Sequence, residues 1–355
     1  MQCLSQTEDL TNYFLRESSR DAIFNNNIAK INKYSLQLCP VYFNLIQKLW
    51  AKNDIKSFSP YEFMDVLDKM SKKDILSFKK GEAGDAKDFI IFILEQFHKE
   101  LKKSVKDKNN INSNNNEPLN QYDRSNAFNN FYNTFTENCS IISDLFFGIN
   151  ETTNECINCK KNYNLMRLEG PICYNYGIFN CLIFPLEEVK KMKNNSFNYN
   201  NNRVSLYECF FYNQKTEYFT GENRNYCNVC KQLSDSLYGN KIFSIPNILI
   251  LILNRGKDNK YDVQLDFEER IDITRFILQK DLHIYDLYGV ITHIGASGPS
   301  AHFVASCKSP VDNKWYRYND AIVTSITNIQ KEVIYFGRPY ILFYHKNKSN
   351  NNFKK

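Results

Sequence analysis

Residues 288–323 have the sequence YGVITHIGASGPSAHFVASCKSPVDNKWYRYNDAIV. Runs 302–307 and 315–318 are rich in β-branched and aromatic residues, and each predicts a short strand. Glycines and a proline directly before residue 302 predict a loop. We expect the two runs to be partner strands of one sheet, with a histidine at the start of the first and Asn319-Asp320 at the end of the second.

His302 is the candidate functional residue of this stretch. Side-chain alternation places His302, Val304 and Ser306 on one face of the predicted strand. A histidine at the mouth of a strand, beside a loop, can act as a general base. The amide of Asn319 or the carboxylate of Asp320 could bind one ring nitrogen and fix its tautomer. A histidine with a purely structural role is the alternative, and the spacing alone leaves it open.

Further strands are predicted on both sides of this stretch. Residues 247–254 (NILILILN) form a dense aliphatic run directly after Pro246, which is typical of a strand buried on both faces. Runs 287–294 and 339–344 predict two more strands.

The first third of the chain predicts helices. Residues 85–102 place large apolar side chains at helical spacing, with aspartates at the start and lysines near the end, which suits the helix dipole. Residues 61–69 predict a shorter helix that follows Pro60. Helices first and strands afterwards indicate the α+β class.

The composition is that of an ordinary globular protein. Of 355 residues, 43% are hydrophobic and 24% charged, and the net charge is +6 without any long basic block. We therefore expect no nucleic-acid partner and, since no run approaches ~20 apolar residues, no membrane span. The odd number of 11 cysteines fits a reducing, intracellular compartment, cytoplasmic or nuclear. The start of the sequence does not resemble a signal peptide.

Two CxxC pairs, Cys156/Cys159 and Cys227/Cys230, predict a metal site. Four thiolates form the closed tetrahedral shell of structural zinc, and no histidine lies beside the pairs to suggest a catalytic metal. Free buried cysteines or disulfides are the alternatives. A zinc ribbon that binds nucleic acid would need a basic patch that the sequence lacks.

Three asparagine-rich tracts interrupt the chain, at 109–116, 194–202 and 347–352. Such polar composition cannot offset the entropy lost on ordering. We expect two flexible insertions and a disordered tail.

Ordered blocks along the whole chain resemble the ubiquitin-specific protease family, which are ubiquitin carboxyl-terminal hydrolases of the cysteine protease class. In chain order, the blocks are residues 2–7 (QCLSQT), 84–89 (GDAKDF), 145–148 (LFFG), the two CxxC pairs, 246–255 (PNILILILNR), 289–320 and 340–344 (YILFY). The histidine-containing block together with the paired CxxC motifs is highly specific.

The resemblance implies a papain-like cysteine protease fold with a helical thumb, zinc-bearing β fingers and a β-rich palm. By position, the thumb corresponds to residues 1–138, the fingers to 139–236 and the palm to 237–346, followed by a tail at 347–355. Ubiquitin or ubiquitinated proteins would be the partners, with the ubiquitin tail lying between thumb and palm. A monomer is expected.

The resemblance also assigns roles to single residues. His302 corresponds to the general base and Asn319 to its orienting partner, while Asp320 follows and assists the polar network. The loop that overlies the ubiquitin tail corresponds to Gly295, Gly298 and Ala301. The implied reaction is deubiquitination, in which a thiol attacks the carbonyl of ubiquitin's terminal glycine.

The family's cysteine motif is the main departure. The sequence starts where that motif ends, as Met1-Gln2, so the nucleophile and the oxyanion-hole asparagine are expected upstream of Met1. Cys3 lacks the loop that precedes the family's nucleophile and is not expected to replace it. Two hypotheses follow: a deubiquitinase that is inactive as residues 1–355 alone, or a non-catalytic ubiquitin-binding module.

Overall fold

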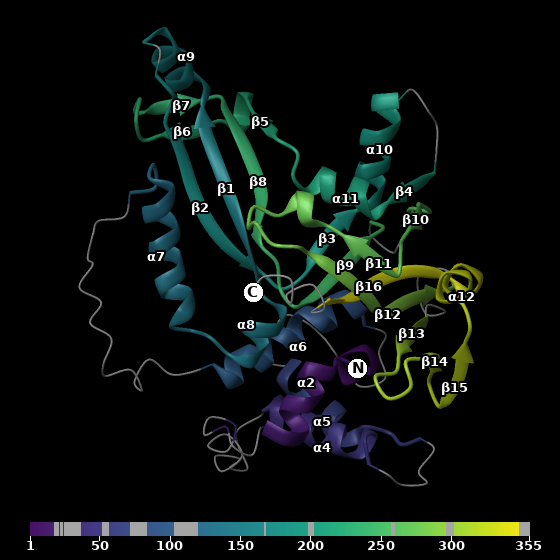
Figure 1. The fold of residues 1–355 in the computed structure, drawn as a ribbon. Helices are drawn as coiled ribbons and strands as arrows, with labels where there is room; N and C mark the ends of the chain where they lie inside the picture. The colour runs from purple at the N-terminus through teal and green to yellow at the C-terminus, as the bar shows by residue number, and fades with distance from the viewer. Residues whose placement is uncertain are drawn as a thin grey trace, which may run out of the picture.

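Strand β9 (Ile248–Asn254) lies inside the large sheet, between strands β16 and β3 (Figure 1). Its residues from Ile248 to Leu253 are all buried. The isoleucines at 248, 250 and 252 belong to one apolar core, and the leucines at 249, 251 and 253 belong to another. The predicted strand buried on both faces is confirmed, because each face meets a different core.

The computed structural model describes residues 1–17, 21, 24, 37–51, 57–71, 84–102, 120–166, 168–197, 202–256, 260–295 and 302–347. The tract 109–116, residues 198–201 and residues 348–352 lie outside the described residues. So do Gly298 and Ala301 of the predicted loop. Residues 194–197 were expected to begin a flexible insertion, but they form the end of helix α10 (Leu186–Phe197).

The large sheet has eight strands and is mixed. Its order is β15 (Ile322–Ile326), β14 (Trp315–Asn319), β13 (His302–Lys308), β12 (Ile284–Ile294), β16 (Arg338–Lys346), β9 and β3 (Leu182–Pro185), with β11 (Arg270–Asp272) paired beside β12. All neighbours are antiparallel except the parallel pair β3–β9. Helix α12 (Ile329–Phe336) connects β15 to β16. The predicted strands are present, although β12 begins earlier than residue 287 because its start also pairs with β11.

Helices from the first part of the chain cover one face of this sheet (Figure 1). They are α1 (Gln2–Ser5), α2 (Glu8–Asn12), η1 (Tyr13–Glu17), α4 (Leu38–Leu49), α5 (Tyr61–Ser71), α6 (Ala86–Leu101) and α8 (Ile141–Phe146). Their aromatic residues Phe14, Tyr42, Phe97 and Phe146 pack with the isoleucines of β9 in what we call the helical core.

Helix α6 occupies nearly the predicted range 85–102. Asp85 caps it, since its carboxylate accepts a hydrogen bond of 2.7 Å from the backbone N–H of Lys87. Most of the predicted stripe is buried, including Ile93 and Phe97, while Phe89 is only half-buried and packs at the edge of the core.

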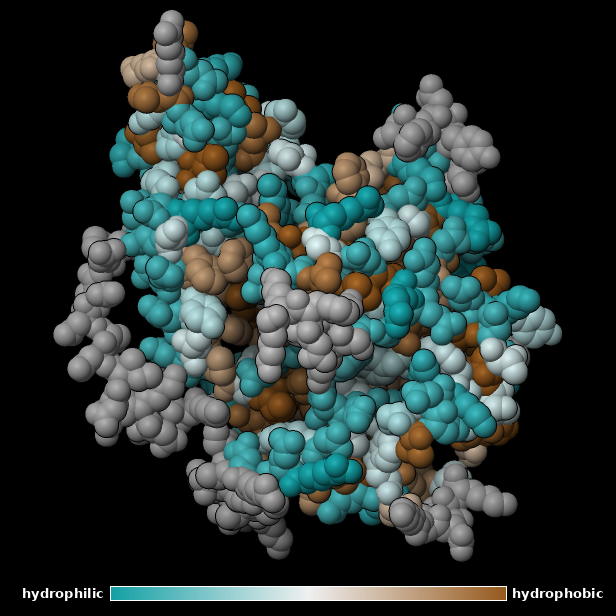
Figure 2. All heavy atoms as spheres, viewed as in Figure 1, coloured by the Kyte–Doolittle hydropathy of each residue, from teal (hydrophilic) through white to brown (hydrophobic). Residues whose placement is uncertain are grey.

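A second, four-stranded sheet projects from the large one (Figure 1). Its order is β2 (Ile172–Phe179), β1 (Gly148–Cys156), β8 (Ser236–Ser244) and β5 (Glu217–Phe219). Near its far end lie α9 (Ile157–Leu165), the one-turn helix η4 (Gly221–Asn223) and the hairpin of β6 (Asn225–Cys227) and β7 (Gln232–Ser234), while α7 (Arg124–Thr136) packs along β2. Apolar side chains gather at the tip of this projection in Figure 2, where Leu165, Met166 and Leu233 are exposed.

Residues 182–197 and 202–213 come between β2 and β5 of the projecting sheet in sequence. They supply one strand of the large sheet and the layer that packs on it. They form β3, α10 (Leu186–Phe197), β4 (Arg203–Ser205) and α11 (Leu206–Asn213). With the leucines of β9 they form the outer core, whose largest side chains include Phe184, Phe210, Tyr285 and Tyr344.

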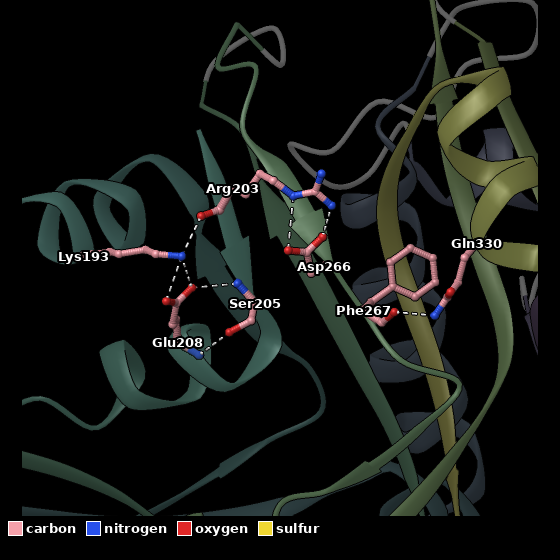
Figure 3. A network of polar contacts seen from close by, with 7 residues as sticks. All are labelled: Lys193, Arg203, Ser205, Glu208, Asp266, Phe267 and Gln330. Carbon is pink, nitrogen blue, oxygen red and sulfur yellow. Dashed lines mark hydrogen bonds and ion pairs between the residues drawn. The ribbon is translucent and has the colours of Figure 1, made fainter. Parts of the chain in front are cut away.

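Polar contacts hold this outer layer together (Figure 3). Ser205 and Glu208 form a capping box at the start of α11, and Lys193 of α10 lies 2.9 Å from the Glu208 carboxylate. Arg203 of β4 pairs with Asp266 of β10 (Gln264–Asp266). These contacts connect α10, α11 and the parallel strand pair β4–β10.

Arg255 directly follows β9 and is almost wholly buried. Its guanidinium donates hydrogen bonds to the backbone carbonyls of Val263 and Pro339. Burial lowers the pKa of Arg255 to about 10, so the group stays charged at neutral pH. Arg255 thus fastens the end of β9 to the start of β16. The short helix η6 (Thr274–Phe276) follows β11 nearby in sequence. Among the described residues, no helix has the length and apolarity to cross a membrane.

Truncation on either face of β9 should destabilise the whole protein. Ile250→Ala opens the helical core and Leu251→Ala the outer core, and each should cost about 2–5 kcal/mol of unfolding free energy in urea titrations. Ile183→Ala on the neighbouring strand β3 is the control, since that side chain is 42% exposed. Equal effects of all three variants would contradict the two-core arrangement.

Candidate active site

His302 and Asn319 lie at neighbouring ends of paired strands. His302 is the first residue of β13 and Asn319 the last residue of β14, and the antiparallel register pairs Ala305 with Tyr318. The start of one strand therefore lies beside the end of the other. Oδ1 of Asn319 is 2.7 Å from Nε2 of His302.

This contact fixes the protonation pattern of the imidazole. A side-chain amide oxygen can only accept, so Nε2 of His302 carries the hydrogen and donates it to Asn319. The neutral ring then keeps its lone pair on Nδ1, and no described residue hydrogen-bonds to that atom. The His302 side chain is 42% exposed, so Nδ1 is available as a base.

Asp320 is close to the same ring but is not its direct partner. Because Asn319 pairs with Ile322, Asp320 and Ala321 form a two-residue hairpin loop. Asp320 has φ +50°, a left-handed conformation that aspartate tolerates better than most residues. Its Oδ2 lies 3.8 Å from Nε2 of His302, beyond hydrogen-bonding distance, and its side chain is 82% exposed. Solvent therefore screens its charge.

A cavity of about 300 Å³ opens beside these residues. Its walls come from α1 and α6 on one side and from β12, β13 and β16 on the other, and they include Phe89, Phe303 and Phe343. Tyr318 and Asp320 also line it, so the cavity extends to the end of β14. The sheet and the helices thus border a cavity of mixed polar and apolar lining, which we call the channel and which reaches Tyr318 and Asp320, the residues on either side of Asn319.

One hydrogen-bonded contact joins the start of helix α6 to the sheet, next to the channel residue Ala86. The hydroxyl of Tyr340 on β16 donates to the Asp85 carboxylate, 2.8 Å from either oxygen. Asp85 therefore both caps α6 and binds the sheet. Burial and the Asp85 contact raise the pKa of Tyr340, so it remains a donor. The ring of Phe303 packs against that of Tyr340 in a tilted arrangement, with ring centroids 5.3 Å apart.

Of the three residues predicted for the loop, only Gly295 lies within the described residues. It directly follows β12 and is exposed, with φ +87°, a conformation that favours glycine. Ile294 pairs with His302, so the loop 295–301 connects strand ends that meet beside the cavity. The part of the loop with Gly298 and Ala301 is not described.

Cys3 is buried away from the histidine pair. It is 2% exposed, and its Sγ lies 3.5 Å from Sγ of Cys307 on the far half of β13. Burial raises the pKa of the Cys307 thiol, so this thiol stays protonated. No described cysteine hydrogen-bonds to His302.

The four cysteines of the CxxC pairs come together at the far end of the projecting sheet. Cys156 ends β1 and its Sγ accepts from the Cys159 backbone N–H at the start of α9, while Cys227 and Cys230 flank the turn after β6. All four sulfur atoms lie within 4.8 Å of one another. The cluster can hold a metal ion such as zinc.

The sulfur spacing matches a tetrahedral shell. Four sulfurs at ~2.3 Å from a zinc ion would be ~3.8 Å apart. Cys156 and Cys230 are 3.8 Å apart, and Cys159 and Cys227 are 3.7 Å apart. The hydrogen bond with Ser234 lowers the pKa of the Cys230 thiol, whereas burial raises the pKa of Cys159 in the same cluster.

The model of the ubiquitin carboxyl-terminal hydrolase family matches residues 1–344. The chain belongs to this family. Ubiquitin carboxyl-terminal hydrolase 2 of Bos taurus is 24% identical over 353 residues, covering 97% of this chain and 52% of the relative. Ubiquitin carboxyl-terminal hydrolase 21 of Homo sapiens is 26% identical over 365 residues, covering 97% and 58%. The chain spans about half the length of these curated relatives.

Solved structures of similar fold include the yeast SAGA DUB module, with a TM-score of 0.65 and 19% identity, covering 98% of this chain and 65% of that chain. The SAGA DUB module Ubp8/Sgf11/Sus1/Sgf73 bound to monoubiquitin also gives a TM-score of 0.65 at 19% identity, covering 98% and 66%. At this identity the likeness shows the fold alone. The predicted α+β fold of this family is thereby confirmed.

Sequence reasoning missed two contacts between the helices and the sheet. Tyr340 and Asp85 are separated by 255 positions, and Cys3 and Cys307 by 304. Local spacing carries no signal for such pairs. Asp85 was visible only as a residue at the start of a predicted helix.

Removal of the Asn319 side-chain carbonyl should allow the His302 imidazole to change its tautomer. In Asn319→Ala, Nε2–H loses its acceptor, so the ring should become a mixture of the Nδ1–H and Nε2–H forms. Long-range nitrogen–proton NMR of labelled protein at pH 8 would measure this, with His302→Gln assigning the signals. Asp320→Ala is the control and should leave the Nε2–H form dominant. An unchanged tautomer in Asn319→Ala would contradict the assignment.

Proposed function

We propose that this chain carries the general base, the orienting residue and the ubiquitin-tail channel of a deubiquitinating cysteine protease. The bond that such a protease would hydrolyse is the isopeptide or peptide bond at the C-terminal glycine of ubiquitin. The observation that carries this proposal is the hydrogen bond between His302 and Asn319, with the channel between helices and sheet reaching the residues on either side of Asn319. The family match supports the chemistry.

In the proposed reaction, Nδ1 of His302 takes the proton of a cysteine thiol, and the thiolate attacks the carbonyl carbon of ubiquitin's terminal glycine. The C–N bond then breaks, and His302 gives the proton to the departing lysine amine. Water hydrolyses the thioester with His302 again as the base. Asn319 holds the ring and stabilises its charged form throughout, as the third member of a triad does.

The channel is the proposed path of the ubiquitin tail. Phe89 of α6 and Phe303 of β13 face it from opposite sides, and an extended peptide between them would end beside His302. Gly295, Gly298 and Ala301 belong to the loop proposed to lie over the tail. The globular part of ubiquitin would then rest on the projecting sheet, so we keep the division into thumb (1–138), fingers (139–236) and palm (237–346).

We propose one structural zinc ion at Cys156, Cys159, Cys227 and Cys230. The ion would complete the tip of the projection, where the four thiols have the spacing of a closed shell. With four protein ligands it would have no open position for chemistry. Its contribution would be to fix the hairpin β6–β7 against α9.

For residues 1–355 as an isolated polypeptide, we propose ubiquitin binding without hydrolysis. The reaction needs an activated thiolate beside Nδ1 of His302, and Cys3 is buried against Cys307 instead. The chain would thus act as a binding module unless the nucleophile is supplied. We place it in a reducing compartment, cytoplasm or nucleus, as a monomer.

Purified protein should contain about one equivalent of zinc by elemental analysis. Cys227→Ser should lose most of the metal and lower the thermal midpoint, because the tip then lacks one thiolate. Cys139→Ser, outside the cluster, is the matched control and should retain the metal. Zinc-free protein with an unchanged midpoint in Cys227→Ser would rule out the site.

Ubiquitin should bind residues 1–355 through its C-terminal tail. Ala86→Trp places an indole at the channel wall and should weaken binding at least about tenfold in calorimetry, a loss of about 1.4 kcal/mol. Ubiquitin without its last two glycines should bind weakly to the wild type and be insensitive to this change. Equal binding of both ubiquitin forms would refute the tail channel.

A ubiquitin–fluorophore substrate tests the catalytic part of the proposal. Residues 1–355 should release no fluorophore above background. Turnover that Cys3→Ala abolishes would overturn the assignment of Cys3 as a buried structural thiol.

A further inference from the structure

Two free thiols meet where helix α1 packs on the large sheet. Cys3 of α1 lines the channel, whereas Cys307 of β13 is wholly buried. Their Sγ atoms are 3.5 Å apart, and the Cys307 thiol donates a hydrogen bond to the Cys3 sulfur. Neither thiol hydrogen-bonds to His302, so the proposed hydrolysis makes no use of this pair.

A bulge in β12 makes room for the Cys3 side chain. The pairing of β12 with β16 shifts between Leu287 and Gly289, which leaves Tyr288 without a partner residue on β16. A Cβ atom at Gly289 would lie 3.3 Å from the Cys3 sulfur and 3.3 Å from Cβ of Phe343, closer than most packed side chains approach. Glycine at this position therefore allows Cys3 to approach the sheet closely.

Hydrogen bonds hold the Cys3 backbone beside the same bulge. The Thr7 hydroxyl donates to the Cys3 carbonyl at 3.0 Å, so its oxygen accepts from the Tyr288 hydroxyl, 2.8 Å away. Burial raises the pKa of Tyr288, so its hydroxyl stays protonated and able to donate. Helix α1 is thereby fastened to β12, and Cys307 lies within the paired strand β13. Both sulfurs extend from backbone that the fold holds in place.

A disulfide between the two sulfurs would need little movement. The S–S bond is ~2.05 Å long, so the sulfurs would have to approach by ~1.5 Å. Cys3 is only 2% exposed, but the channel that it lines has a volume of about 300 Å³, ten times the ~30 Å³ that a water molecule occupies. An oxidant as small as hydrogen peroxide can therefore reach Cys3 through the channel.

We propose that Cys3 and Cys307 are an oxidation site, at which hydrogen peroxide forms a reversible disulfide that joins the helical layer covalently to the sheet. The Cys3 thiolate would attack one peroxide oxygen and break the O–O bond, which gives Cys3 sulfenic acid and, after protonation of the departing hydroxide, water. The Cys307 sulfur would then attack the Cys3 sulfur, and the hydroxyl group would leave with the Cys307 proton as a second water. Two thiols and one peroxide thus give one disulfide and two waters.

The surroundings of the two thiols decide which one reacts first. Burial raises the pKa of Cys307, so this thiol stays protonated and donates to the Cys3 sulfur. Such a hydrogen bond stabilises negative charge on the sulfur that the oxidant can reach. In a reducing compartment the disulfide would be transient, because a cellular dithiol would restore both thiols by exchange. The pair would then respond to peroxide without using the residues assigned to hydrolysis.

Peptide mapping of residues 1–355 tests the proposal directly. Trypsin cuts after Arg16, Lys280 and Lys308, so Cys3 is the only cysteine of peptide 1–16 and Cys307 the only one of peptide 281–308. After treatment with hydrogen peroxide and alkylation of the remaining thiols, mass spectrometry should find these two peptides joined. Dithiothreitol should separate them.

Oxidation should also raise the thermal midpoint of unfolding by about 5 °C, because the cross-link closes a very long loop in the unfolded chain. Cys3→Ala should show neither the joined peptides nor this rise. Cys209→Ala is the matched control, since Cys209 is equally buried but lies in the outer core, and it should keep both. Each variant is compared with its own untreated form, so any destabilisation by the truncation itself does not affect the comparison.

Three results would overturn the proposal. They are wild-type protein in which both thiols can still be alkylated after peroxide treatment, Cys3 oxidised beyond sulfenic acid without joined peptides, and an equal rise of the midpoint in Cys3→Ala. None of them depends on ubiquitin binding. Failure of this oxidation site would therefore leave the proposed function intact, and failure of the proposed function would leave the oxidation site intact.

Discussion

Strand β9 must be covered on both faces, and much of the molecule is arranged by that requirement. Its isoleucines need the helices of the first third of the chain, and its leucines need the layer of β3, α10 and α11. Water on either face would cost the burial free energy of three large aliphatic side chains, each about 1.5–3 kcal/mol. The helical and outer layers are therefore held on opposite sides of one sheet.

The position of His302 and Asn319 follows from this sheet. β16 pairs with β9, β12 with β16, β13 with β12, and β14 with β13, so the register passes from the most buried strand to the one that ends at Asn319. A strand slip of one residue would turn the core side chains of β12 and β16 toward the wrong face. The burial of the inner strands fixes the register of the sheet. That register in turn brings His302 of β13 and Asn319 of β14 into contact.

Helices and sheet meet at a junction that is partly apolar and partly polar. Cys3 and Leu4 of α1 pack in the helical core with Cys307 and Phe343, and the Tyr340 hydroxyl binds the cap residue Asp85 of α6. The channel near the histidine pair is a space left along this junction, on the side of α6. A ligand in such a site would lie between the helical layer and the sheet, and each of the two would supply one wall. The four-cysteine cluster lies apart from this site, at the end of the projecting sheet. The zinc ion that we propose there would order the tip of that sheet.

The sequence by itself determined the local elements and the chemistry-bearing motifs. Strand β9, helix α6, the strands around His302 and the two CxxC pairs are each specified within a few to about twenty residues, because period, caps and ligand spacing are local properties. Residue types and spacing left open which of Asn319 and Asp320 binds the histidine; the family resemblance pointed to Asn319, and the tertiary structure shows that hydrogen bond. Both are polar and adjacent in sequence, but Asn319 still belongs to the strand, whereas Asp320 turns away in a left-handed loop position. Only the tertiary structure decided that the thiols of Cys3 and Cys307 are in contact and that Asp85 binds Tyr340. Those contacts join residues hundreds of positions apart, and their geometry depends on the packing of whole layers, which no short window of sequence encodes.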